Sequence, residues 1–390
     1  MNMKKGLLSG TIILDLTQML SGPYTSLLLA DLGARIIKIE DPAKGDRIRG
    51  MGPHFNHGES AYFLNINRSK ESVCIDLRQE KDREIFYRLV KKADVVLDNF
   101  RPRVLKKLGL EYETLKQCNQ SIIHLSLSAY GQSGPYREAP AFDLTLQAIS
   151  GAMSVTGEPG RDPVRMGLPM GDLAGGTVAA MAISAALYHR EKTGEGSRID
   201  LSLMDCMVSL LTYMAGYYWH SGVIPGPIGS GHQSVVPYQA FRTKTIHIII
   251  AVFVEKFWQA LCDVLDLSGI AEDPRFNSNL QRLKHKDVLI PILQDRFLEK
   301  SGEEWLEKLT EAEVPSAPVN TLDRVLSDPQ VLHRGMVAEV EHSKCGELKI
   351  LGNPVIVEGM DRSYQPAPLL GEHTEDVLRE FLGDDWKSSD

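Results

Sequence analysis

The stretch TIILDLTQMLSGPYTSLLLADLGARIIKIE, residues 11–40, decides the fold class of this chain of 390 residues. The apolar runs at 11–16 and 34–40 are each typical of a buried strand. Between them, SGP at 21–23 predicts a helix start, where Pro23 loses nothing by lacking an N–H, and Gly33 predicts the helix end. A strand, a helix and a strand in this order predict the first unit of a doubly wound parallel sheet.

The turn after the first strand lacks the glycines of a dinucleotide-binding site. It reads DLTQMLSGP at residues 15–23, so the G-x-G-x-x-G pattern that cradles a pyrophosphate is absent. Glu40 ends the second strand where a ribose-binding acid would lie. Without the glycines, we interpret Glu40 as an ordinary charge at a strand end.

The alternation of strands and helices continues along the chain. We expect strands at 72–76, 94–98, 121–127 and 197–203, and helices at 79–92, 102–108, 112–118, 142–150, 178–188 and 205–218. The composition then changes at Gly222, where GVIPGPIGSGHQ (222–233) is rich in glycine and proline. We therefore predict a large domain over 1–221, a small α+β domain over 222–328, and a C-terminal return to the large domain over 329–390.

Within the last two parts the predicted elements are shorter. They are strands at 238–243, 246–252, 336–341 and 347–351, and helices near 257–265, 285–300, 303–313 and 374–382.

Composition excludes several function classes. The net charge of -8 gives no basis for nucleic acid as a bulk partner. The five cysteines are far apart and form no C-x-x-C, which favours a reduced, cytoplasmic protein. The basic start is followed by an apolar run too short for a signal peptide, and we expect no membrane span. His54 and His57 lie in a loop without partner ligands, so we expect no metal.

The segment RMGLPMGDLAGGT (165–177) is the first candidate for chemistry. We expect Asp172 where a loop enters the helix at 178–188, facing the positive end of the helix dipole. There its carboxylate would stay ionised at neutral pH. Gly175 and Gly176 would let a bulky group approach the backbone. The alternative is that Asp172 is only the helix N-cap.

A basic stretch surrounds the strand end at 98–100. Strand ends of this kind line the ligand crevice of an open parallel sheet, and cations there suit a phosphorylated ligand. A solvated helix face is the alternative. The residues are Lys91, Lys92, Arg101, Arg103, Lys106 and Lys107.

Several motifs occur in an order that resembles one family, the class III CoA-transferases, related to formyl-CoA transferase and sharing a superfamily with the α-methylacyl-CoA racemases. The motifs are LTQMLSGP (16–23), LGARIIKIE (32–40), ADVVLDNFRP (93–102), LSAYGQSGP (127–135), MGD (170–172), KTGEG (192–196), GHQ (231–233) and PYQAF (237–241). Together they cover nearly the whole chain.

The resemblance implies a fold and an assembly. The fold is α/β, a Rossmann-like large domain built from both termini with a smaller α+β domain between. Two ring-shaped subunits would interlock into a homodimer.

The resemblance also implies site residues. The nucleophile would be Asp172, and a glycine loop carrying Gly229, Gly231 and Gln233 would cover the site. Coenzyme A would contact Gln18, Met19, Ile75, Arg78, Asn99, Phe100, Arg101, Lys107 and Leu108.

The implied reaction moves CoA from an acyl-CoA donor to a small carboxylic acid through an aspartyl anhydride and an aspartyl-CoA thioester. Racemases of the superfamily instead carry a histidine where this chain has Phe142, which cannot serve as a second base. Departures from the transferase pattern are Asp41 and Arg103. A racemase and a non-catalytic CoA-binding protein are the alternative hypotheses.

Overall fold

The computed structural model describes residues 6–360 and 362–387, so the basic start at 1–5 lies outside the described residues. The chain divides into two compact units. The large unit comprises residues 1–152, 165–222 and 329–390, and the small unit comprises 153–164 and 223–328. The short segment 153–164 thus groups with the later part of the chain, which its sequence does not reveal.

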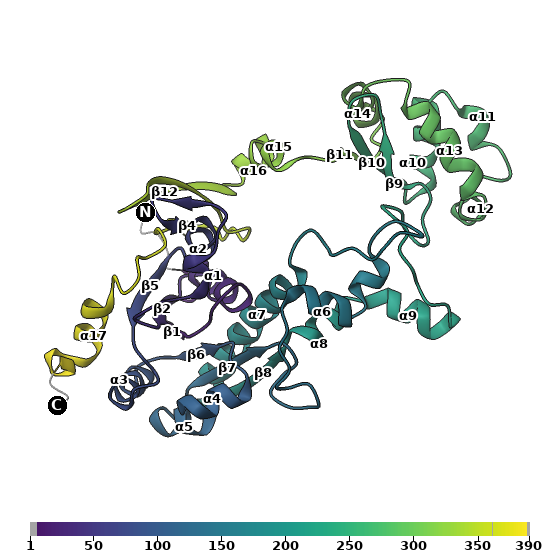
Figure 1. Cartoon of the computed structure of the whole chain (residues 1–390). Coiled ribbons are helices and arrows are strands. Elements are labelled where there is room, and N and C mark those ends of the chain that lie inside the picture. The colour runs from purple at the N-terminus through teal and green to yellow at the C-terminus, as the bar shows by residue number, and fades with distance from the viewer. Residues whose placement is uncertain (1–5, 361, 388–390) are drawn as a thin grey trace. The chain divides into compact units, whose positions relative to one another are not determined.

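A parallel sheet of six strands forms the large unit (Figure 1). The strands are β5 (Lys70–Cys74), β2 (Arg35–Glu40), β1 (Ile12–Asp15), β6 (Val95–Asp98), β7 (Ile123–Ser128) and β8 (Ser197–Ser202), in that spatial order. The order reverses between β1 and β6, as in a doubly wound fold. This topology confirms the predicted parallel α/β sheet.

Helices cover both faces of this sheet because successive strand residues point to opposite sides. Ile13 and Val95 pack in the core under α1 (Ser21–Asp31) and α7 (Met170–Thr193), together with α6 (Asp143–Ile149) and α8 (Leu203–Ser209). Leu14 and Val96 face a second core. That core is covered by α3 (Glu80–Val90), α4 (Pro102–Leu108), α5 (Tyr112–Cys118) and α17 (Thr374–Leu382).

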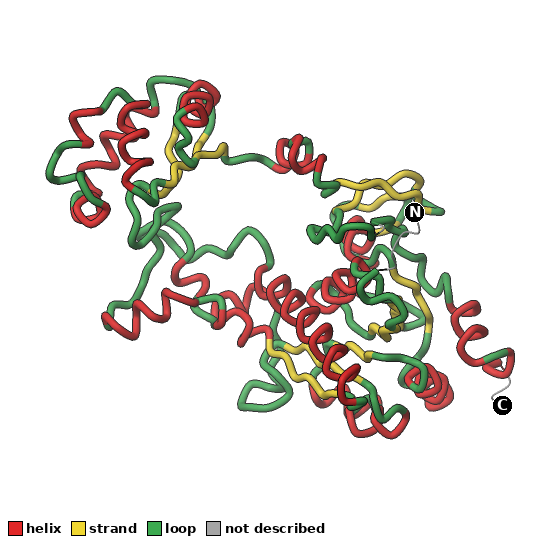
Figure 2. Tube along the Cα trace, turned by 180° about the vertical axis from the view of Figure 1, so that it is seen from behind, coloured by secondary structure: helices red, strands yellow, loops and turns green. Residues whose placement is uncertain are grey.

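The long helix α7 differs from the sequence expectation. It begins at Met170, well before the predicted start at 178, and it runs beside the sheet (Figure 2). Among the described residues, only α7 is long and apolar enough in composition to cross a membrane. Six of its eight buried residues are glycine or alanine, including Gly176 and Ala179, and these small residues allow α1 to pack closely against it.

The C-terminal part adds a helix to the large sheet but no strand. β12 (Val337–His342) and β13 (Gly346–Leu351) pair only with each other, as an antiparallel hairpin. Helix α17 packs on α3 and β5, and the Cys74 N–H donates to Thr374 Oγ1 at 3.0 Å. The large unit therefore combines N-terminal and C-terminal segments, as expected for the large domain, although the described C-terminal strands do not join its six-stranded sheet.

Smaller elements complete the large unit. They are η1 (Arg47–Gly50), β3 (Phe55–Asn56), β4 (Glu59–Ser60), α2 (Ala61–Ile66), α9 (Thr212–Ser221), α16 (Pro329–His333) and η3 (Asp384–Lys387). The single helix predicted at 205–218 is wrong, because the chain breaks between α8 and α9, where Thr212 has a φ of 40°. No glycine or proline marks that break in the sequence.

The small unit has its own sheet and core. Its antiparallel strands lie in the order β11 (Ser316–Pro318), β10 (His247–Ala251) and β9 (Tyr238–Arg242). Its helices are α10 (Glu255–Val264), α11 (Ser268–Ala271), α12 (Asn279–Lys284), α13 (Lys286–Phe297), α14 (Gly302–Glu311) and α15 (Leu322–Leu326), with η2 (Ala152–Val155) at the start of segment 153–164. β11 has no counterpart among the predicted strands.

We predict that Gly176→Ala destabilises the large unit by about 1–3 kcal/mol, the usual penalty for overpacking. A Cβ at this position would lie 2.7 Å from the Ser21 carbonyl oxygen, which is backbone and cannot rotate away. Urea denaturation followed by circular dichroism measures the change. Gly216→Ala in α9 is the matched control, because no atom lies within 4 Å of its added Cβ. Equal stability of the two variants would contradict the packing described here.

Candidate active site

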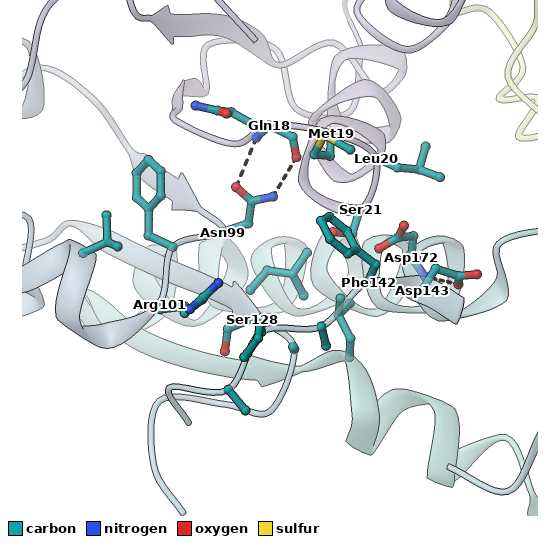
Figure 3. Close-up of a pocket in the computed structure, with 18 of the residues that line it drawn as sticks. Gln18, Met19, Leu20, Ser21, Asn99, Arg101, Ser128, Phe142, Asp143 and Asp172 are labelled. Carbon is teal, nitrogen blue, oxygen red and sulfur yellow. Dashed lines mark hydrogen bonds between the residues drawn. The ribbon is translucent and has the colours of Figure 1, made fainter. Parts of the chain in front are cut away.

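A cavity of about 490 Å³ lies at the carboxyl ends of β1, β6 and β7 in the large unit. This is the edge of a doubly wound sheet at which ligands bind, at the point where the strand order reverses. Figure 3 shows Asp172, Asp143, Ser21 and Phe142 together at one end of the cavity. Its other lining residues include Gln18, Met19, Tyr62, Asn99, Phe100 and Ser128. Four arginines also line it: Arg47, Arg101, Arg103 and Arg137.

Reciprocal hydrogen bonds between Gln18 and Asn99 join the loops after β1 and β6. The Gln18 N–H donates to Asn99 Oδ1 at 3.1 Å, and Asn99 Nδ2 donates to the Gln18 carbonyl at 2.7 Å (Figure 3). The side chain of Asn99 is therefore occupied with the backbone of its neighbour. It shapes the crevice by holding two loops at a fixed separation.

Buried charges support the loop that carries Met19. Lys38 Nζ lies 2.9 Å from Asp46 Oδ2 and donates to the Thr17 carbonyl at 2.7 Å. Asp46 Oδ1 accepts the Met19 N–H at 3.1 Å, and Met19 has a φ of 71°. Although burial opposes it, the adjacent carboxylates raise the pKa of Lys38. This ion pair fixes Met19 in a backbone conformation that is uncommon for residues other than glycine.

Asp172 is not the N-cap of its helix. It lies in the first turn of α7, and the N-cap position is Pro169, which offers no side-chain hydrogen bond. The capping carboxylate comes instead from Asp143 on α6: its Oδ1 accepts the Gly171 N–H at 2.8 Å and the Asp172 N–H at 3.3 Å. The Asp172 side chain is left to face the cavity beside Ser21 (Figure 3).

The pKa of Asp172 shifts in the direction opposite to the one expected from the sequence, although the group stays a carboxylate at neutral pH. Burial, followed by the charge of Asp143, raises the pKa of Asp172 to about 6, while a hydrogen bond from Ser21 lowers it. The expected stabilisation by the helix dipole is not the dominant effect, because Asp143 already satisfies the leading N–H groups. Asp172 is therefore a carboxylate above pH 6 but is readily neutralised below it.

A second cavity of about 320 Å³ adjoins the first, with Gln18, Phe100 and Val104 lining both. Six of the nine residues expected to contact CoA line the second cavity: Gln18, Ile75, Arg78, Phe100, Lys107 and Leu108. The remaining three, Met19, Asn99 and Arg101, line the first. All nine positions thus line one or both of two cavities that share Gln18, Phe100 and Val104, although their contacts with CoA stay a prediction.

Asp41 and Arg103, the two residues that depart from the family pattern, each interact with a neighbouring charged side chain. Asp41 Oδ2 lies 2.8 Å from Arg78 Nη2, so this arginine is shared between Asp41 and Asp76. The Arg103 N–H donates to Glu138 Oε1 at 3.2 Å, and the Arg103 side chain lines the first cavity. A phosphate binding at Arg78 would compete with Asp41.

Some residues of the predicted basic stretch line the two cavities, and others do not. Arg101, Arg103 and Lys107 line the two cavities. Lys92 Nζ instead donates to the Phe381 carbonyl and helps to attach α17.

The glycine loop lies in the small unit. The Gly229 N–H donates to the Gly157 carbonyl at 2.8 Å, so the loop packs on segment 153–164. Gly229 has a φ of 65°, a left-handed conformation that glycine adopts freely. The covering role of Gly229, Gly231 and Gln233 stays a prediction.

Some residues that line the first cavity were not predicted as site residues from the sequence. Asp143 and Arg137 were not among the predicted site residues, and neither was Ser128, a buried hydroxyl with no hydrogen-bond partner in the described part of the chain. No histidine is among the residues that line the first cavity, and Phe142 exposes 67% of its surface there. Within the described ranges, no group of three or more His, Cys, Asp or Glu side chains could hold a metal ion.

Comparisons with known proteins agree with this geometry. The model of CoA-transferase family III matches residues 8–374. Succinyl-CoA:glutarate CoA-transferase of Homo sapiens is 38% identical over 376 residues, covering 96% of this chain and 86% of that protein. Acetyl-CoA:oxalate CoA-transferase of Acetobacter aceti is 37% identical over 386 residues, covering 98% of each. A CAIB/BAIF family protein from Brucella suis has a crystal structure that superposes with a TM-score of 0.87 at 34% identity, covering 97% of this chain and 100% of that one.

The chain belongs to CoA-transferase family III, and it is an enzyme that transfers CoA between acyl groups. The family and the class of reaction predicted from the sequence are thereby confirmed.

We predict that Asp172→Asn stabilises the protein at pH 7.5 but not at pH 4. The folded pKa near 6 lies above the ordinary value of 3.8, so the folded state prefers the protonated form. The penalty of ionisation therefore develops as pH rises from about 4 to 6, and it is on the order of 2–3 kcal/mol above that range. Thermal unfolding at several pH values measures the difference. A variant that is less stable than wild type at pH 7.5 contradicts the raised pKa.

Proposed function

We propose that Asp172 is the nucleophile of this transferase and carries CoA as an aspartyl thioester. The observation that supports the proposal best is its position: a partly buried carboxylate, without a cationic partner among the described residues, at one end of the first cavity. Because nothing neutralises it, the Asp172 oxygen keeps its lone pairs available for attack.

The proposed reaction has two matched halves. An Asp172 oxygen attacks the thioester carbonyl of the donor, and the C–S bond breaks to give an aspartyl anhydride and CoA thiolate. The thiolate attacks Asp172 Cγ, which releases the donor acid and leaves aspartyl-CoA. The acceptor carboxylate then repeats these steps in reverse order. Each step exchanges one activated acyl bond for another, so the reaction needs no ATP.

The two cavities suggest how CoA binds. We place its nucleotide end at Ile75, Arg78, Lys107 and Leu108, in the second cavity, where apolar and cationic groups occur together. The pantetheine arm would pass Gln18 and Phe100, which line both cavities, and bring the thioester to Asp172. This arrangement uses six of the nine residues at which the resemblance implies CoA contact, and the other three, Met19, Asn99 and Arg101, line the first cavity.

We further propose that the acids exchanged are small dicarboxylates. Glutarate and oxalate, named as substrates of two relatives, are dicarboxylates. Arg47 could hold the second carboxylate, because it lines the first cavity and has no hydrogen bond or ion pair among the described residues. It lies on η1, which packs on the helix that bears Tyr62, and the Asp172 charge contributes to the raised pKa of Tyr62.

We also propose that the chain forms a homodimer, and the exposed side chains of helix α9 support this proposal. α9 buries none of its residues, and its aromatic side chains are exposed, Trp219 by 78%. An unburied aromatic face of this kind is typical of a protein interface. A second copy of the chain would cover it, as the resemblance implies.

We predict that Asp172→Ala abolishes transfer while CoA binding survives. Removing the only nucleophile should lower kcat by at least about a thousandfold. Transfer from succinyl-CoA to a panel of acids measures activity, and calorimetry measures CoA binding. Retained transfer would overturn the proposed function. Deuterium incorporation at Cα of a 2-methylacyl-CoA, without any acceptor acid, would indicate a racemase instead.

We predict that Arg47→Gln raises KM for succinate at least about tenfold, the value of one charged hydrogen bond. The KM for butyrate, which lacks the second carboxylate, should stay unchanged. Arg103→Gln is the matched control, because Arg103 lines the same cavity as Arg47 but has no proposed contact with the acid, so it should not distinguish the two acids. An equal effect of Arg47→Gln on both acids would remove Arg47 from acid recognition.

A further inference from the structure

One carboxylate in the cavity has no part in the reaction as proposed so far. Asp143 begins α6, but it is not needed to start that helix, because Thr145 Oγ1 accepts the Phe142 N–H at 2.9 Å. Its own oxygens point toward α7 instead.

Asp143 is held on both of its oxygens. Oδ1 accepts the N–H groups of Gly171 and Asp172, at 2.8 and 3.3 Å. Oδ2 accepts from Gln147 Nε2 at 2.6 Å, and Gln147 Oε1 accepts the Met166 N–H at 2.8 Å. Gln147 is fully buried. These bonds connect α6, the segment before α7 and the first turn of α7 through one carboxylate.

The approach of Asp143 to α7 is close. A Cβ on Gly171 would lie 3.0 Å from Asp143 Oδ1, so a side chain at 171 would crowd this contact. The glycine of the MGD motif therefore admits the carboxylate to the backbone immediately before the nucleophile. Any displacement of Asp143 would move the main chain of Asp172.

We propose that Asp143 is a positioning residue that orients Asp172 and favours its conversion to the neutral aspartyl-CoA. The inference rests on the proposed function, since it assumes that Asp172 is the loaded residue. Two adjacent carboxylates repel each other, and acylation of Asp172 removes one of the charges. The repulsion is thus present in the free enzyme and absent in both covalent intermediates.

The balanced overall step is Asp172 carboxylate plus acyl-CoA giving aspartyl-CoA plus the free acid. Asp143 raises the energy of the left-hand side only, so it shifts the equilibrium toward loaded enzyme. The same repulsion contributes to the raised pKa of Asp172. Other groups facing Asp172 are the Ser21 hydroxyl on α1 and the Tyr62 phenol on α2, and the charged Asp205 on α8 is exposed.

The test uses Asp143→Asn in the full-length protein. Asparagine keeps an oxygen for the Gly171 and Asp172 N–H groups but removes the charge. We expect the fraction of enzyme carrying CoA, measured by intact mass after acid quench at fixed succinyl-CoA and succinate, to fall several-fold. The acid limb of the kcat/KM profile should move to lower pH. Asp205→Asn, an identical change at an exposed site, should alter neither.

The outcomes separate this inference from the proposed function. If wild type never carries CoA, the nucleophile assignment fails. If wild type loads normally and Asp143→Asn shows the same loaded fraction and the same acid limb, only the role of Asp143 fails. Asp143→Ala loses the capping oxygen as well, so it should show lower kcat and lower thermal stability than the asparagine variant. Unchanged kcat and stability in Asp143→Ala would refute the positioning role.

Discussion

The contact between the Asp143 carboxylate and the first N–H groups of α7 determines how this active site is built. Helix N-termini attract anions, and the nearest anion in this chain could have been Asp172 itself. Because Asp143 takes that position, Asp172 is free to face the cavity. The residue that caps the helix and the residue proposed to react are different, and their proximity sets the charge balance of the site.

The surrounding fold holds this arrangement in place through a buried ion pair and through a glycine at the point where two helices pack closely. The Lys38–Asp46 ion pair fixes the loop at Met19. Hydrogen bonds between Gln18 and Asn99 join the loops that follow β1 and β6. Gly176 lets α7 approach the Ser21 backbone directly. The first cavity therefore lies between rigid elements, and the proposed nucleophile, Asp172, would need little rearrangement before attack.

The sequence predicts the large unit well because its signals are local. Residues 11–40 show buried strands flanking a helix, and α4 has the predicted bounds, 102–108, followed by Gly109 with a φ of 69°. Non-local features were missed: the pairing of β12 with β13 away from the main sheet, and the break before Thr212, follow from tertiary packing. The nine expected CoA positions line two cavities with shared residues, whereas the proposed role of Asp143 depends on a distance between two helices that sequence spacing does not encode.

The most direct test of covalent catalysis by Asp172 measures the transfer of ¹⁸O from the acceptor acid to the Asp172 carboxylate. Asp172 is the only acidic side chain between Arg165 and Arg190, so trypsin isolates it in one peptide. When acceptor acid labelled with ¹⁸O in its carboxylate is turned over, collapse of the second anhydride should leave one labelled oxygen on Asp172, and that peptide should gain mass. Repeated turnover with an unlabelled peptide would contradict the account.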